Sequence, residues 1–229
     1  MTTITRRSFM EMAVALSATA AWGQPTATRS KVPWHERRDF YPEGVASGDP
    51  ASDSVILWTR RPPRDSSVVD SLHLEVAEDE SFTRVVANAE APLSEASDWT
   101  CRVLAGGLKP ARIYWYRFTD ATGYGSRVGR TITAPSDDDT RPVRFAFVSC
   151  QNANHGAQNA YRRMIFEDER AAEEDRLGFV LHLGDFIYEI VWYPEDRPQG
   201  MYDRRLRDIV RYEHGEKIRD FHIPTDVGD

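Results

Sequence analysis

Between residues 54 and 132 the hydrophobic positions recur mostly at alternate residues. The stretches 73–77 and 99–104 alternate apolar and polar side chains as half-buried strands do, and 54–60 is a β-rich run. Turns with Gly and Pro separate these runs, and no long helical pattern interrupts them. The pattern predicts a β-sandwich domain over residues 40–135.

One segment of this domain, residues 108–118, indicates the kind of sandwich. Leu108 is followed by Pro110 and Tyr114, and aromatic residues then alternate. This spacing resembles the tyrosine corner of fibronectin-like and immunoglobulin-like sandwiches, in which the tyrosine hydroxyl hydrogen-bonds back to the chain just upstream. Cys101 stands beside apolar neighbours, and we expect it to be a small buried core residue.

The hydrophobic pattern changes after an acidic, proline-containing linker at 136–142. A strand is predicted over 143–150, a helix over 157–176 and a second strand over 178–185. The second strand is apolar nearly throughout, as central strands buried on both faces are. The segment 143–229 is therefore predicted to begin with a βαβ unit that has a right-handed crossover.

Two chemically reactive side chains stand at the ends of these strands. Cys150 ends the first and Asp185 ends the second, and neighbouring strands lie about 4.8 Å apart. Because parallel strands end at the same edge of a sheet, both side chains are expected to reach one point, where a thiolate and a carboxylate would suit a metal ion. Tyr188 is expected to turn back to the same point. Three alternatives stay open: a buried thiol, a capping or turn aspartate, and a core tyrosine.

The amino-terminal residues have the pattern of an export signal. Arg6 and Arg7 precede a short apolar, alanine-rich stretch at 12–22. The arginine pair followed by Phe9 resembles the twin-arginine signal, and an ordinary Sec signal or an amphipathic first helix are the alternatives. We predict that residues 1–24 are a signal cleaved shortly after positions 21–23. The protein would then be periplasmic or secreted, with the twin-arginine translocation machinery as a partner.

Composition narrows the function classes. The net charge is −7, which argues against nucleic acid as the main partner, because phosphate backbones require clustered Lys and Arg. No apolar run reaches the roughly 18 residues that span a bilayer. The two cysteines, Cys101 and Cys150, are assigned to different domains, so we expect no disulfide between them.

Three motifs in order carry a family resemblance: Gly-Val-Ala-Ser-Gly-Asp-Pro at 44–50, Ser-Cys-Gln-Asn at 149–152 and Gly-Asp-Phe-Ile-Tyr-Glu at 184–189. The last is similar to the second motif of metallophosphoesterases, and the set resembles the alkaline phosphatase D family, which includes phospholipase D-type enzymes. The resemblance implies an exported metal-dependent phosphoesterase. It also implies that residues 143–229 are the first part of an α/β metallophosphoesterase sandwich.

The resemblance further implies roles for individual residues. Cys150 would be an iron ligand in place of the usual Asp-x-His pair, Asp185 would bridge iron and calcium as the catalytic residue, and Tyr188 would be an iron-bound phenolate. The two metals would clamp the phosphate of a phosphate-ester substrate and supply a hydroxide for in-line attack. Asn152 and Asn154 are candidates for substrate contact or for closing the loop.

This sequence also departs from the family pattern. A complete member would continue beyond Asp229 with an Asp/Asn-His-Glu motif and further histidines. We therefore expect residues 1–229 alone to fold poorly beyond Pro135 and to show little or no hydrolysis. Two other functions stay open: a non-catalytic exported β-sandwich binding module with a remnant second domain, and a redox or metal-carrying protein that uses Cys150.

Overall fold

The computed structural model describes residues 19–64, 69–151 and 159–186. The chain divides into two compact units, Met1–Thr140 and Arg141–Asp229, which are described separately. No helix in these described ranges is long and apolar enough to cross a membrane.

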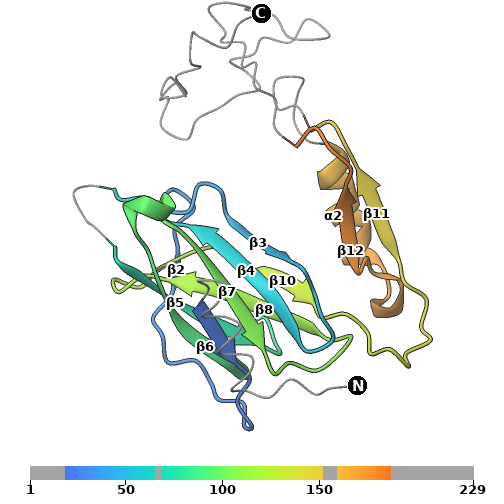
Figure 1. The fold of residues 1–229 in the computed structure, drawn as a ribbon, viewed down its shortest axis with the longest axis horizontal. Helices are drawn as coiled ribbons and strands as arrows, with labels where there is room; N and C mark the ends of the chain where they lie inside the picture. Colours follow the sequence, from blue (N-terminus) through green and yellow to red (C-terminus); the bar gives the residue numbers. More distant parts are fainter. Residues whose placement is uncertain (1–18, 65–68, 152–158, 187–229) are drawn as a thin grey trace, which may run out of the picture. The chain divides into compact units, whose positions relative to one another are not determined.

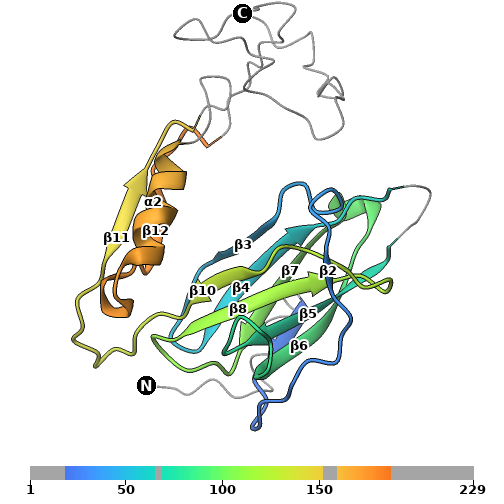
Figure 2. The ribbon, with the colours of Figure 1, turned by 180° about the vertical axis from the view of Figure 1, so that it is seen from behind.

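The first unit is built from two β-sheets (Figures 1 and 2). The four strands of one sheet lie in the order β1 (Thr19–Trp22), β7 (Thr100–Gly106), β4 (Ser54–Arg60) and β3 (Val45–Gly48). The six strands of the other are β2 (His35–Glu36), β9 (Tyr124–Gly125), β8 (Ile113–Thr119), β5 (Ser71–Ala77) and β6 (Val85–Pro92), with β10 (Gly129–Ile132) also paired to β8. A short 3₁₀ helix, η1 (Glu95–Ser97), precedes β7. Most pairings are antiparallel; β1 with β7 and β2 with β9 are parallel.

The alternating pattern of the sequence places one face of each sheet in a common core. In β4, Val55 and Leu57 are buried while the residues between them are partly exposed. In β8, the rings of Tyr114, Tyr116 and Phe118 are buried in the same hydrophobic cluster. Burying a side chain of this size contributes about 1.5–3 kcal/mol. The core between the two sheets therefore holds this unit together, and the predicted mostly-β sandwich is confirmed at that level.

The tyrosine corner is present. The hydroxyl oxygen of Tyr114 accepts a hydrogen bond from the backbone N–H of Lys109 at 2.9 Å. Between them Ala111 has a φ of 49°, so the chain turns sharply there before β8 begins. The contact that the Leu-x-Pro spacing predicted is thus formed.

The folded unit starts earlier in the chain than the predicted boundary at residue 40. Strand β1, inside the predicted signal 1–24, pairs with β7, and β2 pairs with β9. Ala21 of β1 is fully buried, because alanine is small enough to pack between the sheets at their margin. The alanine-rich end of that segment is therefore part of the fold, whereas its role in export stays a prediction.

The second unit contains a strand–helix–strand arrangement, as predicted. Strand β11 (Phe145–Val148) leads to helix α2 (Asn159–Arg170), the 3₁₀ helix η3 (Glu173–Asp175) and strand β12 (Phe179–His182). The two strands are parallel. Helix α2 ends before the predicted limit at 176, because the chain turns back and the Asp168 carboxylate accepts a hydrogen bond from the Leu177 N–H at 2.7 Å.

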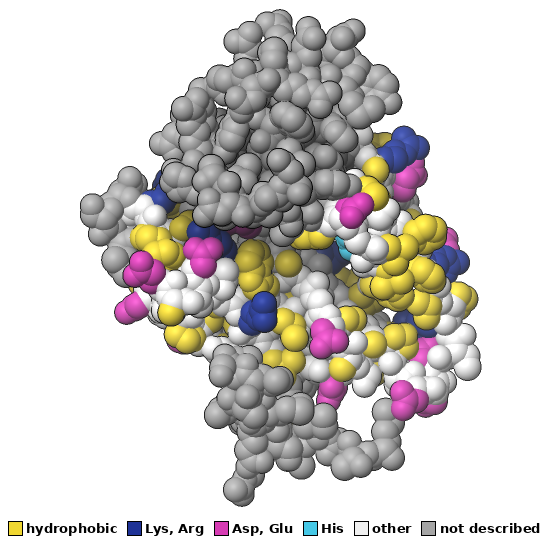
Figure 3. Space-filling view, turned by 45° about the horizontal axis from the view of Figure 1, so that its top comes forward, with side chains coloured by type: hydrophobic (Ala, Val, Ile, Leu, Met, Phe, Trp, Pro, Cys, Tyr) yellow, Lys and Arg dark blue, Asp and Glu magenta, His cyan; other side chains and the backbone are white. Residues whose placement is uncertain are grey.

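Large apolar side chains are exposed on this second unit, and Figure 3 shows hydrophobic side chains gathered on the molecular surface. Phe145 and Phe179 stack with their ring centroids 5.2 Å apart, yet both are exposed. A central strand of an α/β domain would have such residues covered. Within the described chain nothing covers these: Val143, Phe145, Phe147, Ile165, Phe166, Phe179, Val180, Leu181, Leu183 and Phe186.

Candidate metal centre at the carboxyl ends of β11 and β12

The loops that follow β11 and β12 are held together beyond the strands. Val148 pairs with His182 in the last register position of the sheet. Past that point, the Cys150 N–H donates to the Gly184 carbonyl at 3.0 Å, and the Gln151 N–H donates to the Asp185 carbonyl at 3.1 Å. The ladder of backbone hydrogen bonds therefore carries the two loops side by side for three more residues.

This arrangement brings the two principal predicted site residues into contact. The Cys150 thiol donates a hydrogen bond to Oδ2 of Asp185, with 3.0 Å between sulfur and oxygen. Both residues are exposed. The sequence argument that parallel strands would deliver these side chains to one point is confirmed in its geometry.

Both residues have an unusual backbone conformation. The φ angle is 58° at Cys150 and 54° at Asp185, and Gly184 before the aspartate has a φ of 128°. A non-glycine residue in the left-handed region is uncommon, although aspartate tolerates it better than most. Strained backbone of this kind clusters at functional sites, and here two such residues share one hydrogen bond.

Gln151 is a residue of the site to which the sequence analysis assigned no role. Its amide oxygen accepts a hydrogen bond from the Tyr161 hydroxyl of α2 at 2.9 Å, and its amide nitrogen donates to the Phe186 carbonyl at 3.2 Å. The side chain thereby ties the Cys150 loop to the helix and to the Asp185 loop. Its place directly after Cys150, in a polar loop that follows an apolar strand, is the signal that would have identified it.

The other cysteine contrasts with Cys150. Both are free, as expected, and Cys101 is buried in the sandwich. Burial raises the pKa of the Cys101 thiol to about 12, which favours its protonated form at neutral pH. The prediction of a buried core cysteine is confirmed, and the exposed thiol is the one beside a carboxylate.

Five further predicted residues lie outside the described part of the chain. They are the proposed ligand Tyr188, the substrate candidates Asn152 and Asn154, and the signal residues Arg6 and Arg7. Their roles stay predictions.

The two described donors fit a metal ion in their chemistry. A cysteine and an aspartate supply a thiolate and a carboxylate once the shared thiol proton is lost, and metal binding releases such protons. Anionic oxygen donors suit a hard cation, and the thiolate adds a softer ligand. Among the described residues, no group of three or more His, Cys, Asp or Glu side chains is placed so that it could hold a metal ion.

Comparison with known proteins assigns both halves of the chain to one family. The model of the PhoD-like phosphatase N-terminal domain matches residues 26–135, and the model of the PhoD-like phosphatase matches residues 145–221. The first match begins within the amino-terminal segment of the first unit, and the second contains β11, α2 and β12.

Individual relatives agree. Alkaline phosphatase D of Bacillus subtilis (strain 168) is 40% identical over 154 residues, which is 64% of this chain and 25% of that protein. A solved structure of PhoD is 37% identical, with a TM-score of 0.57 over 65% of this chain and 28% of that one. The chain thus spans about a quarter of the length of its curated relative. With two matching domains in order and a matching structure, the chain belongs to the PhoD-like phosphatase family.

Proposed function

We propose that this chain is part of an exported, metal-dependent phosphoesterase that hydrolyses phosphate esters with a dinuclear metal centre. The observation that carries the proposal is the 3.0 Å contact between the Cys150 thiol and the Asp185 carboxylate at the carboxyl ends of two parallel strands. Ligand and substrate sites of open α/β sheets lie at this edge. The relative named alkaline phosphatase D supports the reaction class.

In this proposal Cys150 and Tyr188 would hold iron, and Asp185 would serve as a ligand to both iron and calcium. When bound, the metals supply positive charge for the phosphate oxygens and lower the pKa of water for attack on phosphorus. Asp185 is the catalytic residue because both ions depend on it. The exposed apolar faces of β11 and β12 support a larger α/β sandwich, in which further elements cover them.

Contacts within the chain hold the candidate ligands Cys150 and Asp185 in position before any ion binds. The backbone bonds from Cys150 and Gln151 to the Asp185 loop fix the separation of the two ligands. The Gln151 side chain holds the same loops against α2. Pre-positioned ligands lower the entropy lost on binding, and supporting hydrogen bonds of this kind commonly matter for metal affinity.

Metal titration of the purified complete enzyme tests the ligand assignment directly. Cobalt(II) bound through a thiolate gives a sulfur-to-metal charge-transfer band in the near ultraviolet, so the band should appear with the native chain and vanish in Cys150→Ala. Cys101→Ala is the matched control and should retain the band, because the Cys101 thiol is buried and protonated. A band that survives Cys150→Ala would refute the assignment.

Ferric iron tests the third ligand. A tyrosine phenolate bound to iron(III) gives a visible charge-transfer band that should be absent in Tyr188→Phe and retained in Tyr161→Phe, since the Tyr161 hydroxyl already donates to Gln151. Hydrolysis of bis-p-nitrophenyl phosphate by the complete enzyme should fall by about 10³-fold or more in Asp185→Asn, if the carboxylate holds both ions. Unchanged turnover in that variant would contradict the proposed function.

A further inference from the structure

The end of the predicted export signal is built into the first β-sheet. Strand β1 runs parallel to β7, with Thr19 opposite Val103 and Trp22 opposite Gly106. Its residue Ala21 has no exposed surface. This segment is therefore folded as a sheet margin, whereas a processing protease needs its substrate as a free, extended chain.

The hydrogen bonding continues through the predicted processing region. The Gly23 N–H donates to the Gly106 carbonyl at 2.6 Å, and the Gln24 N–H donates to the Val86 carbonyl of β6 at 2.6 Å. The peptide bonds that follow positions 21–23 all lie in this bonded stretch. None of them has free backbone on both sides while β1 is in place.

We propose that β1 is a latch that protects the processing bonds of the folded precursor, so that cleavage requires β1 to separate from β7. Proteolysis of a folded protein proceeds through local opening, and its rate follows the population of the open form when opening is fast. A precursor exported in the folded state, as the arginine pair predicts, would carry its cleavage site in this closed form. The inference concerns processing and is independent of the phosphoesterase assignment.

Two features make β1 able to open by itself. It has four residues and lies at one end of its sheet, so it pairs with a single neighbour. The following chain is fastened separately: Thr28 and Val85 exchange two backbone hydrogen bonds of 3.0 and 2.7 Å, and the Ser30 N–H donates to the Phe82 carbonyl at 2.9 Å. Opening of β1 therefore leaves the rest of the sandwich attached.

A pair of glycines outside the signal allows a controlled test. Gly107 has a φ of 70°, and a Cβ placed there would lie 2.9 Å from Nε1 of Trp22 and 3.1 Å from the Gly23 nitrogen. Gly44 has a φ of 69°, and a Cβ placed there would meet nothing within 4 Å. Gly107→Ala and Gly44→Ala thus add similar backbone strain, but only the first displaces the end of β1.

The experiment incubates the full precursor, native or with either substitution, with purified signal peptidase in detergent, and follows the product by mass spectrometry. Gly107→Ala should be cut about tenfold faster than the other two, as the clash shifts the opening equilibrium. Equal rates in all three would overturn the proposal. Hydrogen exchange decides the matter even without cleavage: the amides of Gly23 and Gln24 should be protected in the native precursor and in Gly44→Ala, and exposed in Gly107→Ala. Exchange in the native precursor as fast as in a free peptide would also overturn it.

Discussion

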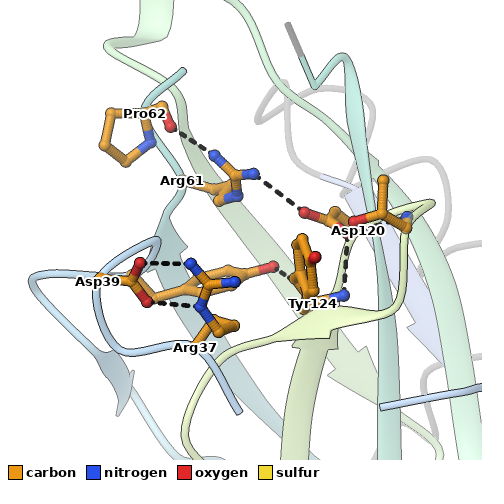
Figure 4. Close-up of polar contacts among 8 residues, drawn as sticks. Arg37, Asp39, Arg61, Pro62, Asp120 and Tyr124 are labelled. Atoms are coloured by element: carbon orange, nitrogen blue, oxygen red, sulfur yellow. Dashed lines mark hydrogen bonds and ion pairs between the residues drawn. The ribbon is translucent and has the colours of Figure 1, made fainter. Parts of the chain in front are cut away.

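Replacing Arg61 by methionine should destabilise the sandwich far more than the loss of an ordinary surface charge would. Arg61 and Asp120 are 2% and 1% exposed, and Nη2 of the arginine lies 3.0 Å from Oδ2 of the aspartate (Figure 4). The guanidinium also packs over the Phe40 ring at 4.3 Å and donates to the Pro62 carbonyl at 2.7 Å. Methionine retains most of the apolar stem and removes the charge.

The structure sets the size of the effect. Removing one partner of a buried ion pair costs about 3–5 kcal/mol, because the other charge stays buried and uncompensated. Here Oδ1 of Asp120 still accepts hydrogen bonds from the N–H groups of Thr122 and Tyr124, at 3.0 and 3.1 Å, which partly stabilise the carboxylate. In addition, Nε of Arg61 is buried without a partner among the described residues, so the substitution also removes one unsatisfied group. Both facts place the expected loss in the free energy of unfolding near the lower end of this range, at about 3 kcal/mol.

Urea unfolding of the full chain, followed by tryptophan fluorescence, measures this loss. Arg60→Met is the control next in sequence: Arg60 pairs with Asp98, whose side chain is 69% exposed, and exposed pairs contribute about 0–1 kcal/mol. The double variant Arg61→Met with Asp120→Asn should regain part of the loss, because no uncompensated charge is left. A cost below about 1 kcal/mol for Arg61→Met, similar to that of Arg60→Met, would refute the reasoning.

Three further predictions concern the same unit, and urea unfolding checks each. Tyr114→Phe removes the acceptor of the corner hydrogen bond and should cost about 1–3 kcal/mol. Gly129→Ala should cost about 1–3 kcal/mol, because its Cβ would lie 2.4 Å from Cζ of Tyr116, whereas Gly48→Ala, with nothing within 4 Å, should change stability little. Burial raises the pKa of Cys101 to about 12, whereas the thiol of an unfolded cysteine titrates near 8.5, so the unfolded state loses its proton first as pH rises. The free energy of unfolding should therefore fall as pH rises from about 8.5 to about 12. The Cys101→Ala variant should show a smaller fall, because it lacks this thiol.

Sequence reasoning identified strands in which large apolar residues alternate and missed those made of small ones. Strand β4 was predicted at its observed limits, Ser54–Arg60, from a β-rich run that ends before Pro62 and Pro63. Strand β6 was missed, since its buried face includes Ala87 and Ala91, which give a weak hydrophobic signal. The alanines of β1 suggested a signal segment, but alanine occurs equally well in a leader, in a helix and at the tightly packed margin of a sheet. Only pairing with the neighbouring strand β7 distinguishes the sheet margin from the other two.

The buried charges were unpredictable for a different reason. Arg61 and Asp120 are 59 residues apart, and each alone resembles a surface residue at the end of a strand. Arg117 pairs with Glu75 in the same way, with 2.8 Å between Nη2 and Oε2, and both side chains are buried. A rule that places charged residues at the surface fails where the fold brings two opposite charges together and removes both from water.

At the candidate site, the meeting of the two side chains could be predicted from strand topology, whereas their backbone conformation could not. Strand order and direction were enough to bring Cys150 and Asp185 together, because parallel neighbours must end at one edge. The left-handed conformation at both residues was beyond sequence reasoning, and it bears on function. In that conformation a residue with a side chain costs about 1–2 kcal/mol more than glycine. The chain has a glycine with positive φ at Gly184, directly before Asp185. On backbone grounds alone glycine would suit position 150 better than cysteine. This strained backbone and the contact of the thiol with a carboxylate support the metal-binding role that we propose for Cys150.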